Sequence, residues 1–166
     1  MMSKYHRYNI LFLCTGNSAR SILAESILRF RDAERFGSYS AGSHPTGEIN
    51  PLALKLLREF HLDTEGLRSK SWDEFAQPGA PKMDFVFTVC GRAAGEVCPV
   101  WIGEPIKAHW GIDDPAAVQG TETERMDAFR TAFRKLESRI KIFTSLPIET
   151  SSPEKLQESL NEIGQR

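Results

Sequence analysis

Runs of apolar residues alternate with amphipathic segments along the chain, and this pattern predicts its strands and helices. Residues 9–14 (NILFLC) are almost continuously apolar, which is typical of a central strand buried on both faces. Residues 84–90 (DFVFTVC) form a second run of this kind. Residues 38–41 and 106–110 are weaker strand candidates. Both of the stronger runs end in a cysteine.

Helical periodicity fills the intervals between these strands. We expect helices over residues 18–32 and 127–143, a helix that opens at Asn50-Pro51, and a last polar helix from Pro153 to Ile163. Asn is a favoured N-cap, and Pro is favoured at the first helical position. The residues expected to face the core are Ile22, Leu23, Ile27, Leu28 and Phe30, then Leu52, Leu56, Leu57 and Phe60, then Phe129, Phe133, Leu136, Ile140 and Phe143.

The alternation of strands and helices predicts an α/β fold of three layers, in which helices cover both faces of a parallel sheet. A chain of 166 residues has the size of one domain. We expect a core over about 8–145 and a peripheral extension over 146–166, where apolar residues are sparse. Ligands of such sheets bind beyond the carboxyl ends of the strands, where Cys14 and Cys90 lie.

Charge and hydropathy exclude several function classes. The formal net charge is −1, whereas non-specific nucleic-acid binding needs a strong basic excess. No run approaches the ~18 apolar residues that span a bilayer, and the apolar run near the start is too short for a signal peptide. We therefore expect a soluble cytoplasmic protein. Its three cysteines are too few for a secreted disulfide scaffold and suggest catalysis, redox chemistry or a metal.

The segment between the first strand and the first helix carries the candidate chemistry. Its residues are Cys14, Thr15, Gly16, Asn17, Ser18, Ala19, Arg20 and Ser21. A loop of this length can wrap one tetrahedral anion with its backbone N–H groups, and the helix N-terminus adds a positive end. Arg20 offers a planar fork to two anion oxygens. Thiolates are stabilised at helix N-termini and beside cations, so Cys14 is the predicted nucleophile.

The smaller side chains of this loop have supporting roles. Gly16 permits a backbone conformation that most residues resist, Asn17 can tie the loop internally, and the Ser21 hydroxyl can donate to the sulfur. The alternative is a buried packing cysteine with Arg20 as an ordinary surface residue. The strand before the loop and the helix after it favour the functional interpretation.

A displacement at this loop needs a general acid, and Asp114 is the candidate. Pro115 keeps Asp114 out of the α conformation, which helps a loop to present the carboxylate. A solvated turn carboxylate is the alternative. His109 and Trp110, just before it, are expected to be structural.

Four motifs together resemble one known family. They are residues 14–21, 38–42, 88–90 and 109–115, and they are similar to the arsenate reductases built on the low-molecular-weight protein tyrosine phosphatase fold. The resemblance extends over most of residues 8–143. It implies a four-stranded parallel sheet flanked by helices, with Cys14 as nucleophile, Arg20 as oxyanion clamp and Asp114 as general acid. It also implies that Asn17, Ser21, Glu25 and Ser40 support the loop or a nearby cation. No metal site and no tightly bound cofactor are expected.

The remaining cysteines distinguish two activities within this family. A phosphatase needs only Cys14, Arg20 and Asp114, whereas an arsenate reductase must also transfer two electrons. Cys90 is placed to attack the Cys14–arsenic adduct, and Cys98 to attack Cys90 in turn. The resemblance implies this relay, with thioredoxin as the external reductant.

Two departures from the family pattern affect the choice of reductant. Seven residues separate Cys90 from Cys98, one more than expected in thioredoxin-coupled members, so glutathione with glutaredoxin is the alternative reductant. Ala19 stands where a loop cysteine is often found.

Three other interpretations remain open at this stage. Cys90 and Cys98 are packing residues if the protein is a phosphatase. Together with His109 they are also possible zinc ligands, although the spacing lacks a paired knuckle and a fourth ligand. A non-enzymatic anion-binding module is the third, and a thiol in the path of the anion argues against it.

Overall fold

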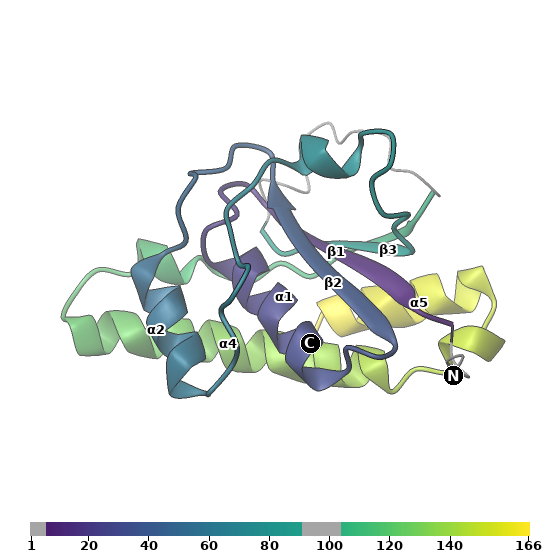
Figure 1. Ribbon diagram of the computed structural model, residues 1–166. Helices are drawn as coiled ribbons and strands as arrows, with labels where there is room; N and C mark the ends of the chain where they lie inside the picture. Colours follow the sequence, from purple (N-terminus) through teal and green to yellow (C-terminus); the bar gives the residue numbers. More distant parts are fainter. Residues whose placement is uncertain (1–5, 91–103) are drawn as a thin grey trace.

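The structure is a computed structural model, and it describes residues 6–90 and 104–166. Its centre is a parallel four-stranded sheet with the strand order β2-β1-β3-β4 (Figure 1). The strands are β1 (Tyr8–Cys14), β2 (Phe36–Gly42), β3 (Phe85–Thr88) and β4 (Ile106–His109). The α-helices of the described residues are α1 (Arg20–Arg31), α2 (Pro51–Glu59), α4 (Glu122–Thr144) and α5 (Pro153–Gly164). The predicted α/β class, a four-stranded parallel sheet flanked by helices, is confirmed.

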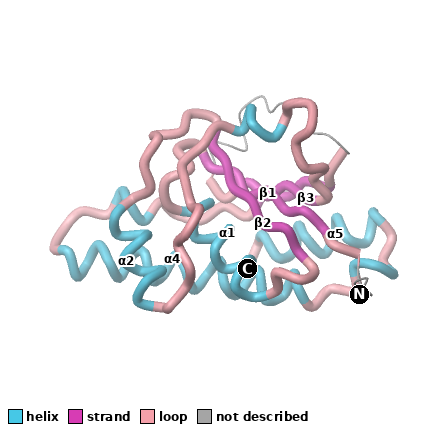
Figure 2. The backbone as a smooth tube through the Cα atoms, in the orientation of Figure 1, coloured by secondary structure: helices cyan, strands magenta, loops and turns pink. Residues whose placement is uncertain are grey.

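Strand β1 lies in the middle of the core, as its apolar run predicts. Successive side chains of a strand point to opposite faces of the sheet. Ile10 and Phe12 therefore join the main cluster, which includes side chains from all four of these helices. Leu11 and Leu13 join a smaller cluster on the other face, which contains Phe75 of the 3₁₀ helix η1 (Trp72–Phe75). Figure 2 shows the strands between the helices on one side and the loop that carries η1 on the other.

Several element boundaries differ from the prediction, and the largest difference, at the start of α4, has a cause in local hydrogen bonding. Helix α4 begins at Glu122, not at residue 127, since Thr121 and Glu124 form a capping box. Each side chain accepts from the other residue's backbone N–H, which satisfies donors of the first turn. Strand β3 ends at Thr88, so Cys90 lies just beyond the strand.

Two aromatic residues that we expected in the core are exposed. Phe30 is 72% exposed and Phe60 is 39% exposed. Phe30 lies in the last turn of α1 and Phe60 caps the end of α2, where periodicity no longer ensures a covering element. Phe60 stacks on Phe133 of α4 with the ring centroids 4.6 Å apart. The rest of the expected core faces of α1, α2 and α4 are buried.

Helix α5 packs more closely than a peripheral extension would. Leu156, Leu160 and Ile163 are buried in the main cluster. Trp110 is fully buried after β4, stacks on Phe87 and donates its indole N–H to the Leu160 carbonyl at 3.0 Å. The 3₁₀ helix η3 (Ile148–Thr150) connects α4 to α5. Across residues 6–90 and 104–166, no helix combines the length and apolar character that crossing a membrane requires.

Candidate active site

The loop of residues 14–20, here the Cys14 loop, follows the carboxyl end of β1 and leads into α1. Cys14 is paired in register with Gly42, the last residue of β2. A Cβ atom at Gly42 would lie 2.5 Å from the Thr15 carbonyl oxygen and 2.9 Å from the Asn17 nitrogen. Only glycine at this position allows β2 to approach the loop so closely.

Neighbouring segments hold the carbonyl groups of the Cys14 loop. The Thr15 carbonyl accepts from His44 N–H, the Gly16 carbonyl from Thr46 N–H, and the Ser18 carbonyl from Asn50 N–H. In a planar trans peptide the C=O and N–H point in opposite directions. The N–H groups of the following residues therefore turn to the other side of the loop. The first turn of α1 has no side-chain cap among the described residues. The backbone N–H groups of the loop and of this first turn can therefore cradle an anion.

A short chain of hydrogen bonds orients the Cys14 thiol. Asn17 adopts a left-handed backbone conformation with φ of 44° and is buried. Its Oδ1 accepts from Lys70 N–H at 2.9 Å, which fixes the amide, and its Nδ2 donates to Ser21 Oγ at 2.8 Å. Cys14 Sγ lies 2.8 Å from Ser21 Oγ, and the Ser21 hydroxyl can donate to the sulfur once the thiol is ionised. Ser21 is therefore oriented to stabilise a thiolate.

Arg20 and Asp114, far apart in the sequence, lie side by side. Arg20 Nη1 donates to the Ile112 carbonyl at 3.0 Å, and Nη2 lies 3.7 Å from Asp114 Oδ2. Asp114 caps the 3₁₀ helix η2 (Pro115–Ala117) by accepting from Ala116 N–H at 3.0 Å. This contact orients the carboxylate beside the guanidinium of Arg20.

Replacement of Arg20 by lysine should lower kcat/KM by at least about tenfold, or ~1.4 kcal/mol. A point ammonium cannot reproduce the two-pronged contact of a guanidinium with an oxyanion. Steady-state kinetics with arsenate and with an aryl phosphate measure the effect. The matched control is Arg130→Lys, a partly exposed residue of α4 that pairs with Glu59 and Asp127. A smaller loss at Arg20 than tenfold would show that it is not the clamp.

Cys90 lies beside the Cys14 loop. Its buried sulfur accepts from Thr15 N–H at 3.3 Å, so it contacts the residue that follows Cys14. Cys98 lies outside the described residues. In the part of the chain that is described, no group of three or more His, Cys, Asp or Glu side chains could hold a metal ion. His109 Nδ1 lies 2.8 Å from the cross-strand partner Thr88 Oγ1, a structural hydrogen bond.

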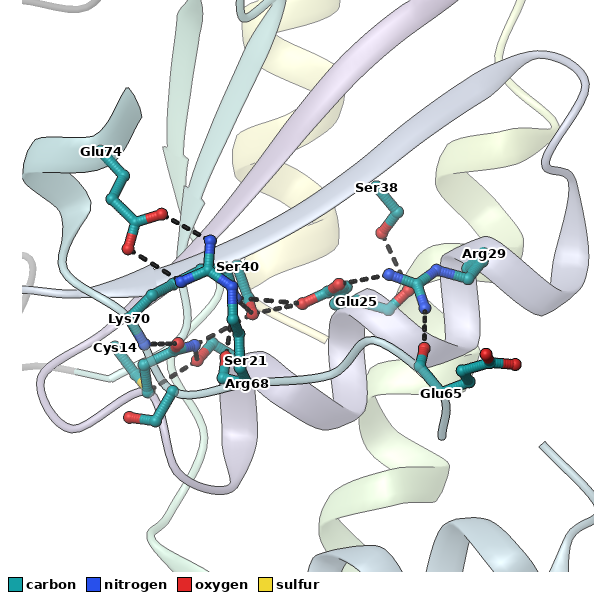
Figure 3. A network of polar contacts seen from close by, with 12 residues as sticks. Cys14, Ser21, Glu25, Arg29, Ser38, Ser40, Glu65, Arg68, Lys70 and Glu74 are labelled. Carbon is teal, nitrogen blue, oxygen red and sulfur yellow. Dashed lines mark hydrogen bonds and ion pairs between the residues drawn. The ribbon is translucent and has the colours of Figure 1, made fainter. Parts of the chain in front are cut away.

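Asn17, Ser21, Glu25 and Ser40, grouped by the resemblance, are brought together beneath the loop. Ser40 Oγ donates to Glu25 Oε1 and accepts from Asn17 Nδ2 at 3.0 Å. Glu25 has two cationic neighbours, the buried side chain of Lys70 and the partly exposed Arg29 (Figure 3). Burial lowers the pKa of Lys70, and the nearby Glu25 opposes that effect.

Sequence reasoning missed two basic residues that support the site. Lys70 lies in a polar loop with no periodicity, so its burial leaves no signal in the sequence. Arg139 lies on the predicted buried face of α4. A charged residue on that face is a signal in the sequence of a buried, hydrogen-bonded side chain. Arg139 donates to the Trp110 carbonyl at 2.6 Å and the Gly111 carbonyl at 3.2 Å. These bonds tie down the segment that leads to Asp114. Burial lowers the pKa of Arg139.

Comparisons with known proteins identify one family, in which both phosphatases and arsenate reductases are found. Residues 9–160 match the family model described as low molecular weight phosphotyrosine protein phosphatase. An arsenate reductase of Oceanobacillus iheyensis is 40% identical over 134 residues, which cover 81% of this chain and 93% of that protein.

Two solved structures share the fold. One, described as an arsenate reductase in the phosphate binding state, is 24% identical with a TM-score of 0.66, covering 81% of this chain and 94% of that one. A thioredoxin-dependent arsenate reductase of Corynebacterium glutamicum is 24% identical with a TM-score of 0.55, covering 83% of this chain and 64% of that one.

Proposed function

Because the chain belongs to the low molecular weight phosphotyrosine protein phosphatase family, we propose that it reduces arsenate to arsenite with Cys14 as nucleophile. The relative that is 40% identical is an arsenate reductase, and it is covered almost in full. The Cys14 loop supplies backbone donors for a tetrahedral oxyanion, and Arg20 supplies the fork that binds two of its oxygens.

The first step forms a bond between sulfur and arsenic. The Cys14 thiolate attacks arsenic(V), and one oxygen leaves as water after Asp114 donates a proton to it. Arg20 lies 3.7 Å from Asp114, so the clamp and the acid can act on the same anion. Ser21 donates to the sulfur at 2.8 Å and supports the thiolate before the attack.

The second step transfers two electrons. The Cys90 thiolate attacks Cys14 Sγ, the sulfur–arsenic bond breaks, and its electron pair leaves with arsenic, which becomes arsenite. The two sulfurs are oxidised together to a Cys14–Cys90 disulfide. Cys98 then attacks Cys90, which frees Cys14 and leaves a Cys90–Cys98 disulfide for an external dithiol to reduce.

The observation that carries this proposal is the contact between Cys90 Sγ and Thr15 N–H at 3.3 Å. A second thiol beside the nucleophile serves no purpose in phosphate-ester hydrolysis, whereas reduction requires one. Thioredoxin is the proposed reductant, and glutaredoxin with glutathione is the alternative. We place the reaction in the cytoplasm, where such systems keep thiols reduced.

The decisive experiment compares two activities of the same protein preparation, arsenate reduction and phosphate-ester hydrolysis. Arsenite release is measured with a thioredoxin system and with a glutathione–glutaredoxin system, and hydrolysis of an aryl phosphate is measured beside them. Multiple-turnover arsenite release with either system supports a reductase. Hydrolysis without arsenite release would contradict the proposal.

Hydrolysis of phosphate monoesters is the second candidate, because Cys14, Arg20 and Asp114 suffice for it. Phosphate would move onto the Cys14 thiol, and water would then remove it. The contact of Arg20 with Asp114 favours this chemistry as much as it favours reduction, so the two activities can coexist in one site.

Replacement of Asp114 by asparagine should slow the chemical step by ~10²–10⁴-fold, since an amide cannot protonate the leaving oxygen. Anion binding should persist, because the side chain keeps its shape and its cap to Ala116 N–H. Single-turnover rates and phosphate affinity separate the two effects. The matched control is Asp113→Asn on the exposed neighbour. A larger loss from Asp113→Asn would reassign the general acid.

A further inference from the structure

Lys70 lies in a buried polar cluster beneath the Cys14 loop, and the mechanism above leaves it unused. Its side chain is 8% exposed, and Glu25 beside it is 4% exposed. We propose that the Lys70 ammonium group is a positioning residue, which holds the Cys14 loop in its anion-binding form through Ser40 and Asn17. This inference rests on the proposed function, since it concerns the same loop.

Both the main chain and the side chain of Lys70 make hydrogen bonds in this cluster. The Lys70 N–H donates to Asn17 Oδ1 at 2.9 Å, and the Lys70 carbonyl accepts from Gly42 N–H at 2.9 Å. The ammonium donates to the Arg68 carbonyl at 2.9 Å and to Ser40 Oγ at 3.4 Å. Its nitrogen also lies 3.8 Å from Glu25 Oε1. The ammonium therefore has two hydrogen-bond acceptors and one ion-pair partner in this cluster.

The directions of the hydrogen bonds lead from Lys70 to the nucleophile. Ser40 Oγ gives its one proton to Glu25, so it can only accept from Lys70 and from Asn17 Nδ2. The second proton of the Asn17 amide then goes to Ser21, whose hydroxyl is left to donate to Cys14 Sγ. Figure 3 shows Ser40 and Ser21 between Glu25 and Cys14. When Cys14 is a thiolate, each proton of this network has one acceptor, and Ser21 donates to the sulfur.

Charge gives the ammonium its role. Glu25 is a buried carboxylate whose other cationic partner, Arg29, is partly exposed. Without Lys70, Glu25 would lose the cation on the side that faces the loop. Its negative charge would then oppose the oxyanion that the loop binds, and Ser40 would lose one donor. The uncompensated charge of Glu25 and the lost donor to Ser40 would both weaken the hydrogen bonds that fix the Asn17 amide.

The test uses three variants. Lys70→Met removes the charge and keeps the length, Lys70→Ala removes the arm, and Lys55→Met is the control at an exposed lysine of α2 that pairs with Glu122. We expect kcat/KM to fall about 10- to 100-fold in both Lys70 variants, the range for loss of a hydrogen-bonded charge. Lys55→Met should match the parent. Parent-like kinetics of Lys70→Met would overturn the proposal.

Chemical rescue distinguishes positioning from a general contribution to folding. n-Propylammonium restores the three carbons and the nitrogen that Lys70→Ala removes. It should raise the activity of Lys70→Ala saturably, and it should have no effect on Lys70→Met, whose side chain fills the space. Tetramethylammonium at equal ionic strength should not rescue. Failure of n-propylammonium to rescue a folded Lys70→Ala protein would overturn the proposal.

A second readout does not depend on which reaction the enzyme catalyses. Alkylation of Cys14 by iodoacetamide, and protection of Cys14 by inorganic phosphate, report the loop directly. Phosphate should protect the parent at concentrations about 10- to 100-fold lower than it needs for Lys70→Met. If the parent binds phosphate in this way but releases no arsenite, the proposed function fails and the role of Lys70 stands. Equal protection of the parent and Lys70→Met overturns the role of Lys70 alone.

The pH dependence of phosphate protection adds a signature of the ammonium. The charged groups around Lys70 are Glu25 and Arg29 on α1, Arg68 beside it, and Glu74 of η1. Because burial lowers the pKa of Lys70 below its ordinary value of 10.5, the ammonium is lost as pH rises through that lowered pKa. Phosphate affinity should fall there in the parent beyond any fall in Lys70→Met. Identical profiles of the two proteins would overturn the proposal.

Discussion

Replacement of Cys14 by serine should abolish both arsenate reduction and phosphate-ester hydrolysis. The Cys14 thiol is aligned by Ser21 at 2.8 Å and is followed by the N–H groups of the anion cradle. An alcohol in the same place ionises far less readily than a thiol. Loss of a covalent nucleophile costs on the order of 10⁴–10⁶-fold in kcat. Arsenite release and aryl-phosphate hydrolysis, measured on one preparation, give the result.

The Cys14→Ser variant should still fold and bind phosphate, because Arg20 and the backbone of the loop are unchanged. Its melting temperature and phosphate affinity are therefore the controls. Substantial turnover by a variant that is folded and binds phosphate would contradict the assignment of Cys14 as nucleophile. Turnover lost together with phosphate binding would instead point to a damaged loop.

The central strand and the loop after it were predictable because their signals are local. The apolar run of residues 9–14, the turn cluster after it and the helical period that follows identify β1, the Cys14 loop and α1 without any distant contact. Fully buried Ile10 and Leu13 confirm the first of these signals. The start of α4 also has a local signal, the capping box of Thr121 and Glu124. The prediction placed the start at residue 127 because it used apolar spacing alone.

The parts that failed or stayed hidden depend on long-range contacts. Phe30 fits a helical period, yet its exposure is decided by which elements cover the end of α1. Lys70 reaches Asn17, 53 positions away in sequence, and nothing beside it predicts burial. The approach of Asp114 to Arg20 came from the family resemblance, since the local sequence favours an exposed turn. Composition and hydrophobic periodicity predict which secondary structure a segment can form. The site depends on which segments come into contact in the fold.

Replacement of Cys90 by serine should eliminate multiple-turnover arsenite release and leave aryl-phosphate hydrolysis nearly unchanged. Hydrolysis needs no second thiol, whereas reduction stalls at the adduct of Cys14 with arsenic. Serine keeps an acceptor for Thr15 N–H, which Cys90 Sγ accepts at 3.3 Å, so the loop should retain its form. A coupled assay with thioredoxin or glutaredoxin measures release, and hydrolysis by the same protein is the internal control.

Cys98→Ser should be intermediate, because the first disulfide can still close but its removal then depends on an external thiol reaching Cys90. Mass spectrometry after arsenate treatment should detect a Cys14–Cys90 link in Cys98→Ser and a Cys90–Cys98 link in the parent. If both variants reduce arsenate normally, the relay is refuted and hydrolysis becomes the better interpretation of the site. If only Cys98 is dispensable, the seven residues between Cys90 and Cys98 mark a two-thiol enzyme served by glutathione and glutaredoxin. Since Cys90 is buried against Thr15, that outcome would also require the Cys90 sulfur to become exposed before an external thiol could attack it.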